Sequence, residues 1–181
     1  DFSINNDNSV YYENSFKTGK TKEDGTFAED FIIAKEYADV GILQGKAYIT
    51  VFDETSRPVN RLETFQVITQ DAFFGIKKFE RYISTNTKFS VPIIALDKNG
   101  ATLNNVQATV QLVRKRWNTV LERGYDEGYR YVSQIKEDIL FEKTMSISGT
   151  GTTMPVNAVQ SGDYEIRIKR PGASRYAYYS F

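Results

Sequence analysis

Residues 106–117 read VQATVQLVRKRW, and this run carries the clearest secondary-structure pattern in the chain. Its apolar members fall at every second position: Val106, Ala108, Val110 and Leu112. Successive side chains of a β-strand point to opposite faces, so this spacing is typical of a strand with one buried face. The same period of two recurs at residues 47–52 and 164–169 and predicts a fold made of strands.

Turn sequences separate these runs at Asp24-Gly25, Asn99-Gly100, Gly162-Asp163 and Pro171-Gly172. The pattern predicts a dozen strands, near residues 10–20, 26–34, 45–53, 61–69, 73–83, 87–97, 106–117, 129–134, 138–147, 152–158, 163–169 and 175–181. One helix candidate, residues 34–40, is too short to contribute much. We therefore expect an all-β chain of tandem antiparallel β-sandwiches, similar to immunoglobulin or fibronectin type III domains.

A domain boundary is expected near residues 69–73, where one long strand ends and the next begins. Residues 71–181 are long enough for a complete sandwich. Residues 1–70 provide only about four strands, so we expect an incomplete sandwich whose leading strands precede Asp1. The two parts also differ in charge. Residues 1–70 carry 7 basic and 12 acidic residues, whereas the remainder carries 16 and 11.

The composition excludes several classes of function. The 181 residues contain neither cysteine nor histidine, and 23 basic residues balance 23 acidic ones. Ser-His-Asp and Cys-His catalysis are excluded, as are the usual ligand sets of zinc, copper, haem and iron–sulfur sites. No run approaches the roughly 18 apolar residues of a membrane span. We expect no cofactor, no metal, no enzymatic activity and no direct membrane contact.

Two short motifs suggest ligand binding but fit turns better. Gly19-Lys20-Thr21 resembles the end of a phosphate-binding loop, yet Asn14 stands where that motif needs glycine. Asp97-Lys98-Asn99-Gly100 resembles the start of a calcium loop, but Ala101 and Leu103 replace the later ligands. Asn-Gly between two strands is typical of a tight turn, because both residues tolerate positive φ.

The basic run Arg114-Lys115-Arg116-Trp117 is the sharpest local feature. On a strand, Arg114 and Arg116 share one face, while Lys115 and Trp117 share the other. A phosphate or nucleic-acid strip with a stacking tryptophan is one interpretation. The acidic Glu122 nearby weakens it. We favour a long strand whose end extends into solvent, with Trp117 packing against another domain, and we expect no nucleic-acid partner.

Tyrosines cluster in two places, and adjacent carboxylates in two others. Tyr129 and Tyr131 share a strand face, as do Tyr176 and Tyr178. Such faces bind sugars or protein partners, but cross-strand pairing or domain packing is the preferred interpretation. The candidate interface residues are Arg114, Arg116, Trp117, Tyr129 and Tyr131. The pairs Asp126/Glu127 and Glu137/Asp138 are sequential, so on a strand they point apart and form no glycosidase dyad.

Taken in order, several segments resemble the macroglobulin-like domains of bacterial alpha-2-macroglobulin family proteins. They are FGIK at 74–77, ALDKNG at 95–100, the strand ending in LVRKRW at 112–117, and GDYEIRI at 162–168. Residues 23–27 and 47–59 resemble the second half of a preceding macroglobulin domain. There Ser56 stands where the family often has glycine.

The resemblance implies a scaffold role. The family comprises large secreted or periplasmic protease traps in which a protease cuts a bait region and, in many members, a Cys-Gly-Glu-Gln thioester captures it. This chain has no cysteine and no insertion typical of a bait region. The resemblance thus implies a non-catalytic piece of a bacterial endopeptidase inhibitor, in the periplasm, at the cell surface or outside the cell. Its partners would be other domains of its parent chain and, through that parent, proteases.

Two alternatives remain open. One is an immunoglobulin- or fibronectin-like adhesin, or a carbohydrate-binding module, that uses exposed tyrosines. The other, less favoured, is a carboxylate-based enzyme or an accessory piece of one, for which no residue pattern marks a site.

Overall fold

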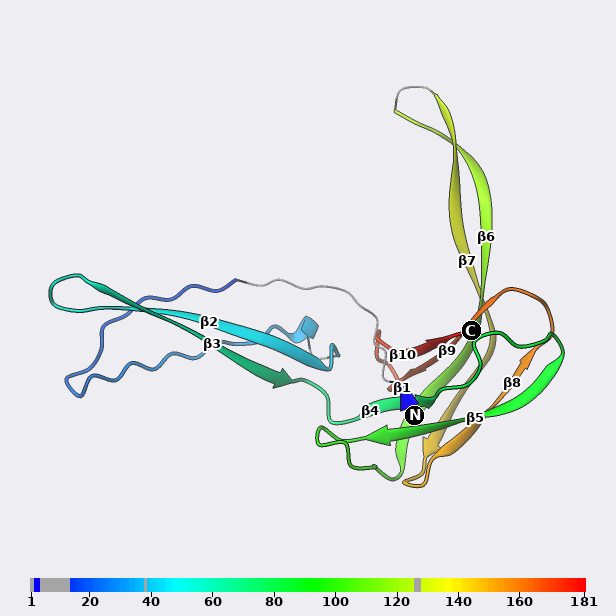
Figure 1. Ribbon diagram of the computed structural model, residues 1–181, viewed down its shortest axis with the longest axis horizontal. Helices are drawn as coiled ribbons and strands as arrows, with labels where there is room; N and C mark the ends of the chain where they lie inside the picture. Colours follow the sequence, from blue (N-terminus) through cyan, green and yellow to red (C-terminus); the bar gives the residue numbers. More distant parts are fainter. Residues whose placement is uncertain (1, 4–13, 38, 126–127) are drawn as a thin grey trace. The chain divides into compact units, whose positions relative to one another are not determined.

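A computed structural model describes residues 2–3, 14–37, 39–125 and 128–181 (Figure 1). The described residues form ten strands and one 3₁₀ turn, which is all that remains of the helix candidate at 34–40. The elements are β1 (Phe2–Ser3), η1 (Lys35–Tyr37), β2 (Ile42–Phe52), β3 (Pro58–Ile68), β4 (Phe73–Lys77), β5 (Thr87–Leu96), β6 (Val106–Arg123), β7 (Tyr129–Ile147), β8 (Thr152–Ala158), β9 (Asp163–Lys169) and β10 (Ala177–Ser180). The prediction of an all-β chain with antiparallel sheets is confirmed.

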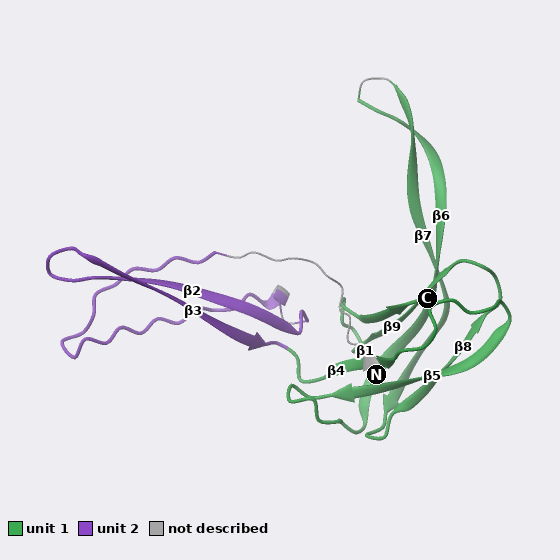
Figure 2. Cartoon of the chain, in the orientation of Figure 1, with its two compact units in different colours: residues 1–7, 70–181 green, residues 8–69 purple. Residues whose placement is uncertain are grey.

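The chain divides into two compact units, shown in different colours in Figure 2. One, the sandwich unit, consists of Asp1–Asp7 and Gln70–Phe181. The other, the hairpin unit, consists of Asn8–Thr69. In the described part of the chain, no helix has the length and apolar character needed to cross a membrane.

The sandwich unit is built from two four-stranded sheets. Their strand orders are β1-β4-β5-β8 and β10-β9-β6-β7, and every pairing is antiparallel. Strands β7 and β8 follow each other in the chain yet lie at the edges of different sheets. The sandwich therefore has an open side bordered by two edge strands.

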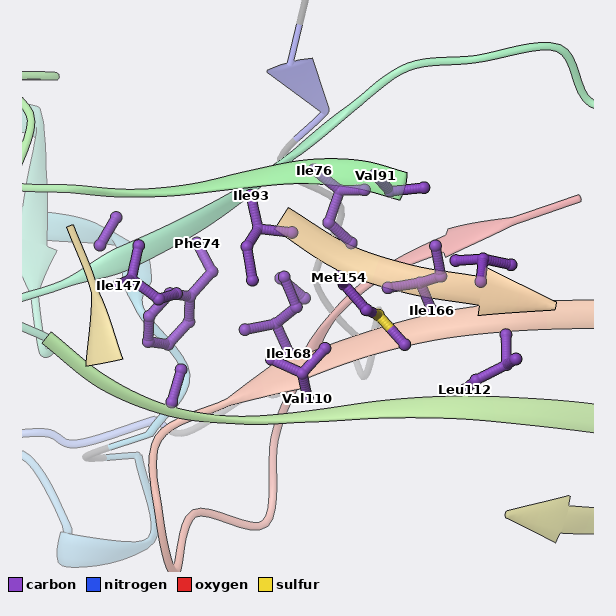
Figure 3. Packing of buried hydrophobic residues seen from close by; sticks show 14 of the residues in the cluster. Phe74, Ile76, Val91, Ile93, Val110, Leu112, Ile147, Met154, Ile166 and Ile168 are labelled. Carbon is purple, nitrogen blue, oxygen red and sulfur yellow. The ribbon is translucent and has the colours of Figure 1, made fainter. Parts of the chain in front are cut away.

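The core lies between these two sheets (Figure 3). The alternating residues predicted to face inward are buried, so β6 contributes Ala108, Val110 and Leu112. The largest fully buried side chains are Ile76, Val91, Ile93, Val110, Val113, Ile147, Met154, Val156, Ile166 and Ile168. Burying one such side chain contributes about 1.5–3 kcal/mol, which gives this cysteine-free unit its main stabilisation.

The hairpin unit contains one antiparallel pair, β2 with β3, in register from Ile42↔Ile68 to Phe52↔Pro58. The predicted strands near 10–20 and 26–34 are corrected here. Residues 14–20 and 26–34 are not strands, while residues 10–13 lie outside the described part of the chain. A strand needs a neighbour to bond its backbone groups, and these segments pair with no described strand.

Two acidic turns, one in each unit, share the same hydrogen bonds. Asp53 Oδ1 accepts from the backbone N–H of Thr55 (2.8 Å) and Arg57 (2.9 Å). Asp97 Oδ1 accepts in the same way from residues two and four positions later, both at 2.8 Å. Ser56 and Gly100 occupy equivalent positions, with φ of 61° and 82°. The carboxylate of Asp97 thus holds its own turn together.

Candidate interaction surface on the β6–β7 arm

The candidate interface residues lie on or beside a two-stranded extension of the sandwich unit. Strand β9 pairs with β6 only as far as Lys115↔Asp163. Beyond that point residues 116–123 of β6 pair with residues 129–136 of β7, and with no other described strand. This extension, here called the arm, projects from the sheets in Figure 1. The predicted strand 106–117 is therefore too short, because β6 continues to Arg123.

The predicted strands 129–134 and 138–147 are one strand, β7, and this is a second correction. Leu112 pairs with Phe141 and Val113 with Ile139, which leaves Leu140 as an extra residue. The extra residue of such a β-bulge shifts the side-chain alternation by one, so odd-numbered residues face one side before it and the other side after it. After the bulge, from Phe141 to Ile147, the odd-numbered residues of β7 face the core side. Before it, from Tyr129 to Ile139, the odd-numbered residues face away from the core. We call the core-side face of the arm its inner face and the opposite side its outer face.

The outer face of the arm carries large, exposed apolar side chains on both sides of the polar pair Thr119↔Ser133. Trp117 stands opposite Ile135, and Leu121 stands opposite Tyr131. Exposure of these four side chains runs from 49% for Ile135 to 78% for Tyr131. Tyr129, opposite Arg123, extends the row toward the tip. We call this row the apolar stripe: Trp117, Leu121, Tyr129, Tyr131 and Ile135. Exposed aromatic and aliphatic side chains in one row are typical of a contact surface.

The inner face carries mostly charged and polar side chains around the pair Val120↔Val132, and several of these polar groups are bonded to one another. Arg116 contacts both carboxylate oxygens of Asp138, with Nη2–Oδ1 at 2.9 Å and Nε–Oδ2 at 2.6 Å. The hydrogen bond from Arg116 lowers the pKa of the Asp138 carboxyl. Gln134 Nε2 donates to Glu122 Oε1 at 2.8 Å. The large apolar side chains of the arm therefore gather on its outer face and most of its charged side chains on its inner face.

The five predicted interface residues do not share a surface. Trp117, Tyr129 and Tyr131 lie on the outer face, and Arg114 and Arg116 lie on the inner side. Arg114 donates from Nη1 to Gln160 Oε1 and from Nη2 to the Ser161 carbonyl. The structure thus separates the two arginines from the tryptophan, and Lys115, which shares the outer face with Trp117, is bound to Glu165.

A network of buried charges lies on the outer face at the foot of the arm, and the sequence patterns did not indicate it. The side chain of Arg167 is 10% exposed and that of Glu165 is 3% exposed. Arg167 Nε donates to Glu165 Oε2 at 2.6 Å, and both Nη atoms donate to Glu137, at 2.5 and 2.8 Å. Lys115 Nζ donates to Glu165 Oε1 at 2.8 Å. The network joins β9 to β7 across β6.

Electrostatics of this network follow from its hydrogen bonds. The bond from Arg167 lowers the pKa of the Glu137 carboxyl. Burial disfavours the charge of Arg167, but its bonds to Glu137 and Glu165 outweigh burial and raise the pKa of its guanidinium. The guanidinium also lies over the Tyr176 ring, 4.5 Å from its centroid. Arg167 therefore favours the ionised form of Glu137 on the neighbouring part of β7.

The other residues singled out from the sequence are the adjacent carboxylates and the second tyrosine pair. Glu137 bonds Arg167 on the outer face and Asp138 bonds Arg116 on the inner face, so the two carboxylates point apart as expected. Asp126 and Glu127 lie outside the described residues. The Tyr176 and Tyr178 rings pack edge to face at 6.3 Å. Across the described ranges, no group of three or more acidic side chains is arranged to hold a metal ion.

Comparison with known proteins gives one family match and several related structures. The model of the family described as bacterial macroglobulin domain 6 matches residues 75–181. The chain is 27% identical over 116 residues to the alpha-2-macroglobulin of Pasteurella multocida (strain Pm70), a match that covers 62% of this chain and 6% of that protein. The chain thus spans a small fraction of that relative's length.

Two solved structures show the same fold over 77% of this chain. A crystal structure of a Salmonella alpha-2-macroglobulin mutant has a TM-score of 0.54 at 17% identity, with 10% of that chain covered. Escherichia coli alpha-2-macroglobulin activated by porcine elastase has a TM-score of 0.52 at 22% identity, with 13% covered. The predicted resemblance to macroglobulin domains is confirmed.

Proposed function

Since this chain belongs to the bacterial macroglobulin domain 6 family, we propose that it is a non-catalytic scaffold piece of a bacterial endopeptidase inhibitor related to alpha-2-macroglobulin. Its role is to pack against other domains of a longer polypeptide, which acts on proteases in the periplasm or outside the cell. We further propose that residues 1–70, apart from β1, which pairs with β4 of the sandwich unit, are the last part of a preceding macroglobulin-like domain and that residues 71–181, together with β1, form a complete one.

The observation that carries this proposal is the apolar stripe. Trp117 is 62% exposed and Tyr131 78% exposed, and both lie on the same face of a ribbon that is paired only with itself among the described residues. Monomeric domains seldom leave a row of large apolar side chains in water unless the row contacts a partner. The small share of its relative that this chain spans supports a partner within the same polypeptide, because the chain covers only 6% of the Pasteurella protein.

Chemical labelling tests this assignment. The chain has no cysteine, so Tyr131→Cys places one thiol on the stripe. We expect a maleimide to label this site rapidly in the isolated 181 residues and at least tenfold more slowly in the full-length protein, as read by peptide mass spectrometry. Tyr82→Cys is the matched control, because Tyr82 is 87% exposed and lies between β4 and β5, away from the arm. Equal labelling of the Tyr131→Cys site in both proteins contradicts the scaffold contact.

A second assay addresses inhibition and the carbohydrate-binding alternative. The isolated chain should leave the cleavage of a protein substrate by elastase unchanged. Protease trapping by these 181 residues alone would overturn the scaffold role. Specific binding on a glycan array, lost in Tyr129→Ala and Tyr131→Ala, would favour a carbohydrate-binding module instead.

A further inference from the structure

A second surface lies at the foot of the arm, on its inner side, where the two sheets of the sandwich unit diverge. It is a groove of about 690 Å³, and its walls come from β5, β6, β7, β8, β9 and the segment between β8 and β9. The apolar part of its lining includes Phe89, Leu140, Phe141 and Val159. The groove opens beside β7 and β8, the edge strands of the two sheets. An extended peptide can therefore lie along it.

Two of the apolar lining residues leave about half of their surface in water instead of packing into the core. Leu140 is 50% exposed and Val159 is 54% exposed. Leu140 is the extra residue of the β-bulge, and bulges commonly redirect a side chain at a functional surface. Its neighbour Ile139 is 58% exposed but lies on the outer face, opposite Val113. The bulge thus presents one leucine to the groove and one isoleucine to the opposite side.

The charged groups of the groove have one sign. Lys88 and Arg114 line it, and no carboxylate is among its described lining residues. Asp138, which pairs across the strands with Arg114, is bound by Arg116 instead. Arg114 is held in place by Gln160 and Ser161, and Tyr164 in turn donates from its hydroxyl to the Gln160 carbonyl at 2.7 Å. A fixed arginine beside an apolar surface complements a carboxylate next to an apolar side chain.

We propose that this groove binds an extended acidic segment of the longer polypeptide, with an aliphatic side chain against Leu140 and Val159 and a carboxylate against Arg114 and Lys88. The occupant lies outside residues 1–181. The inference rests on the proposed function, since it takes the occupant from the same polypeptide. The positive lining of the groove supports an acidic occupant, and the small share of the relative's length that this chain covers supports a source in the same polypeptide.

The test is an NMR titration of the isotopically labelled 181-residue chain with the synthetic peptide acetyl-Asp-Leu-Asp-Leu-Asp-amide. We expect saturable shifts of the Arg114 Nε–H, the Gln160 side-chain amide and the Leu140 methyls. Leu140→Ser should weaken binding at least fivefold, whereas the matched Ile139→Ser should change it less than twofold. Lys88→Gln and added salt should each weaken binding, and neither removes the bonds from Arg114 to Gln160 and Ser161.

Three results would overturn the proposal. They are no saturable shift at the groove, equal binding of the peptide with asparagine in place of aspartate, and equal effects of Leu140→Ser and Ile139→Ser. Groove shifts that depend on protein concentration without peptide would identify a second copy of the chain as the occupant and would also overturn it. Because the titration involves no protease and no other domain, its failure is distinguishable from failure of the scaffold role.

Discussion

Replacing Arg167 with methionine removes the central cation of the network at the foot of the arm. Methionine fills part of the same volume but cannot donate to Glu137 or Glu165. Within the described part of the chain, Glu165, with a side chain 3% exposed, then keeps the Lys115 ammonium at 2.8 Å and the Ser180 hydroxyl at 3.1 Å as hydrogen-bond partners. Removing one member of a buried ion pair costs about 3–5 kcal/mol. Since Lys115 still compensates Glu165, we expect the lower end, about 3 kcal/mol.

Urea unfolding measures this loss. Trp117 is the only tryptophan and lies in the sandwich unit, so its fluorescence follows that unit, with far-UV circular dichroism as a second probe. At a slope of about 2 kcal/mol per M, the midpoint should fall by about 1.5 M. The matched control is Arg81→Met, in the exposed segment between β4 and β5, which should cost less than about 0.5 kcal/mol.

A double variant tests whether the buried charges stabilise the foot of the arm. Arg167→Met together with Glu165→Gln removes the isolated carboxylate, so the pair should cost less than the sum of the two single changes. A loss below about 1 kcal/mol for Arg167→Met, or strict additivity of the double variant, would show that the buried charges do not stabilise the foot of the arm.

Four further predictions concern the core, the turns and pH. Ile93→Ala, at a fully buried site, should lower the free energy of unfolding by about 2–5 kcal/mol in the same urea assay. Gly100→Ala should cost about 1 kcal/mol in that assay, because φ is +82° although no atom lies within 4 Å of the added methyl group. Ser56 has a φ of 61°, which glycine adopts at lower cost, so Ser56→Gly should stabilise the turn and slow amide exchange of the next residue a few-fold. The pKa of Glu137 is lowered from its ordinary value near 4.5, so the stability it contributes is complete above that value and is lost as pH falls through the folded pKa. Glu137→Gln should therefore reduce the difference in urea midpoint between pH 7 and pH 3.

Strand prediction succeeded where one buried face and clear turns coincide. Strands β8 and β9 have the predicted bounds, 152–158 and 163–169, because inward residues alternate strictly and turn residues flank them. The predicted strand at 26–34 failed, because periodicity within one segment does not provide a partner. The outer half of β6, residues 118–123, has no buried face, so its strand state depends on pairing with β7.

The candidate surface was predictable only in part. The sequence period correctly assigns Arg114 and Arg116 to one face and Trp117 to the other. It cannot place Trp117 opposite Ile135, because that contact depends on register between two strands. The consecutive apolar residues Ile139, Leu140 and Phe141 interrupt the alternation and are the one signal of the bulge. Without the bulge, the stripe residues of β7 would face the same side as Phe141.

Strand β6 is shared by the core and the arm, and this has a mechanical consequence. The same unbroken backbone runs from buried Ala108 to Arg123. A sideways load on the tip therefore acts as a torque on a lever whose fulcrum is Lys115, the last residue of β6 paired with β9. A pull along the arm instead loads the β6–β9 hydrogen bonds in shear. Either motion strains the bonds from Arg167 to Glu137, so displacement of a domain seated on the stripe would be transmitted into the sandwich through that ion pair.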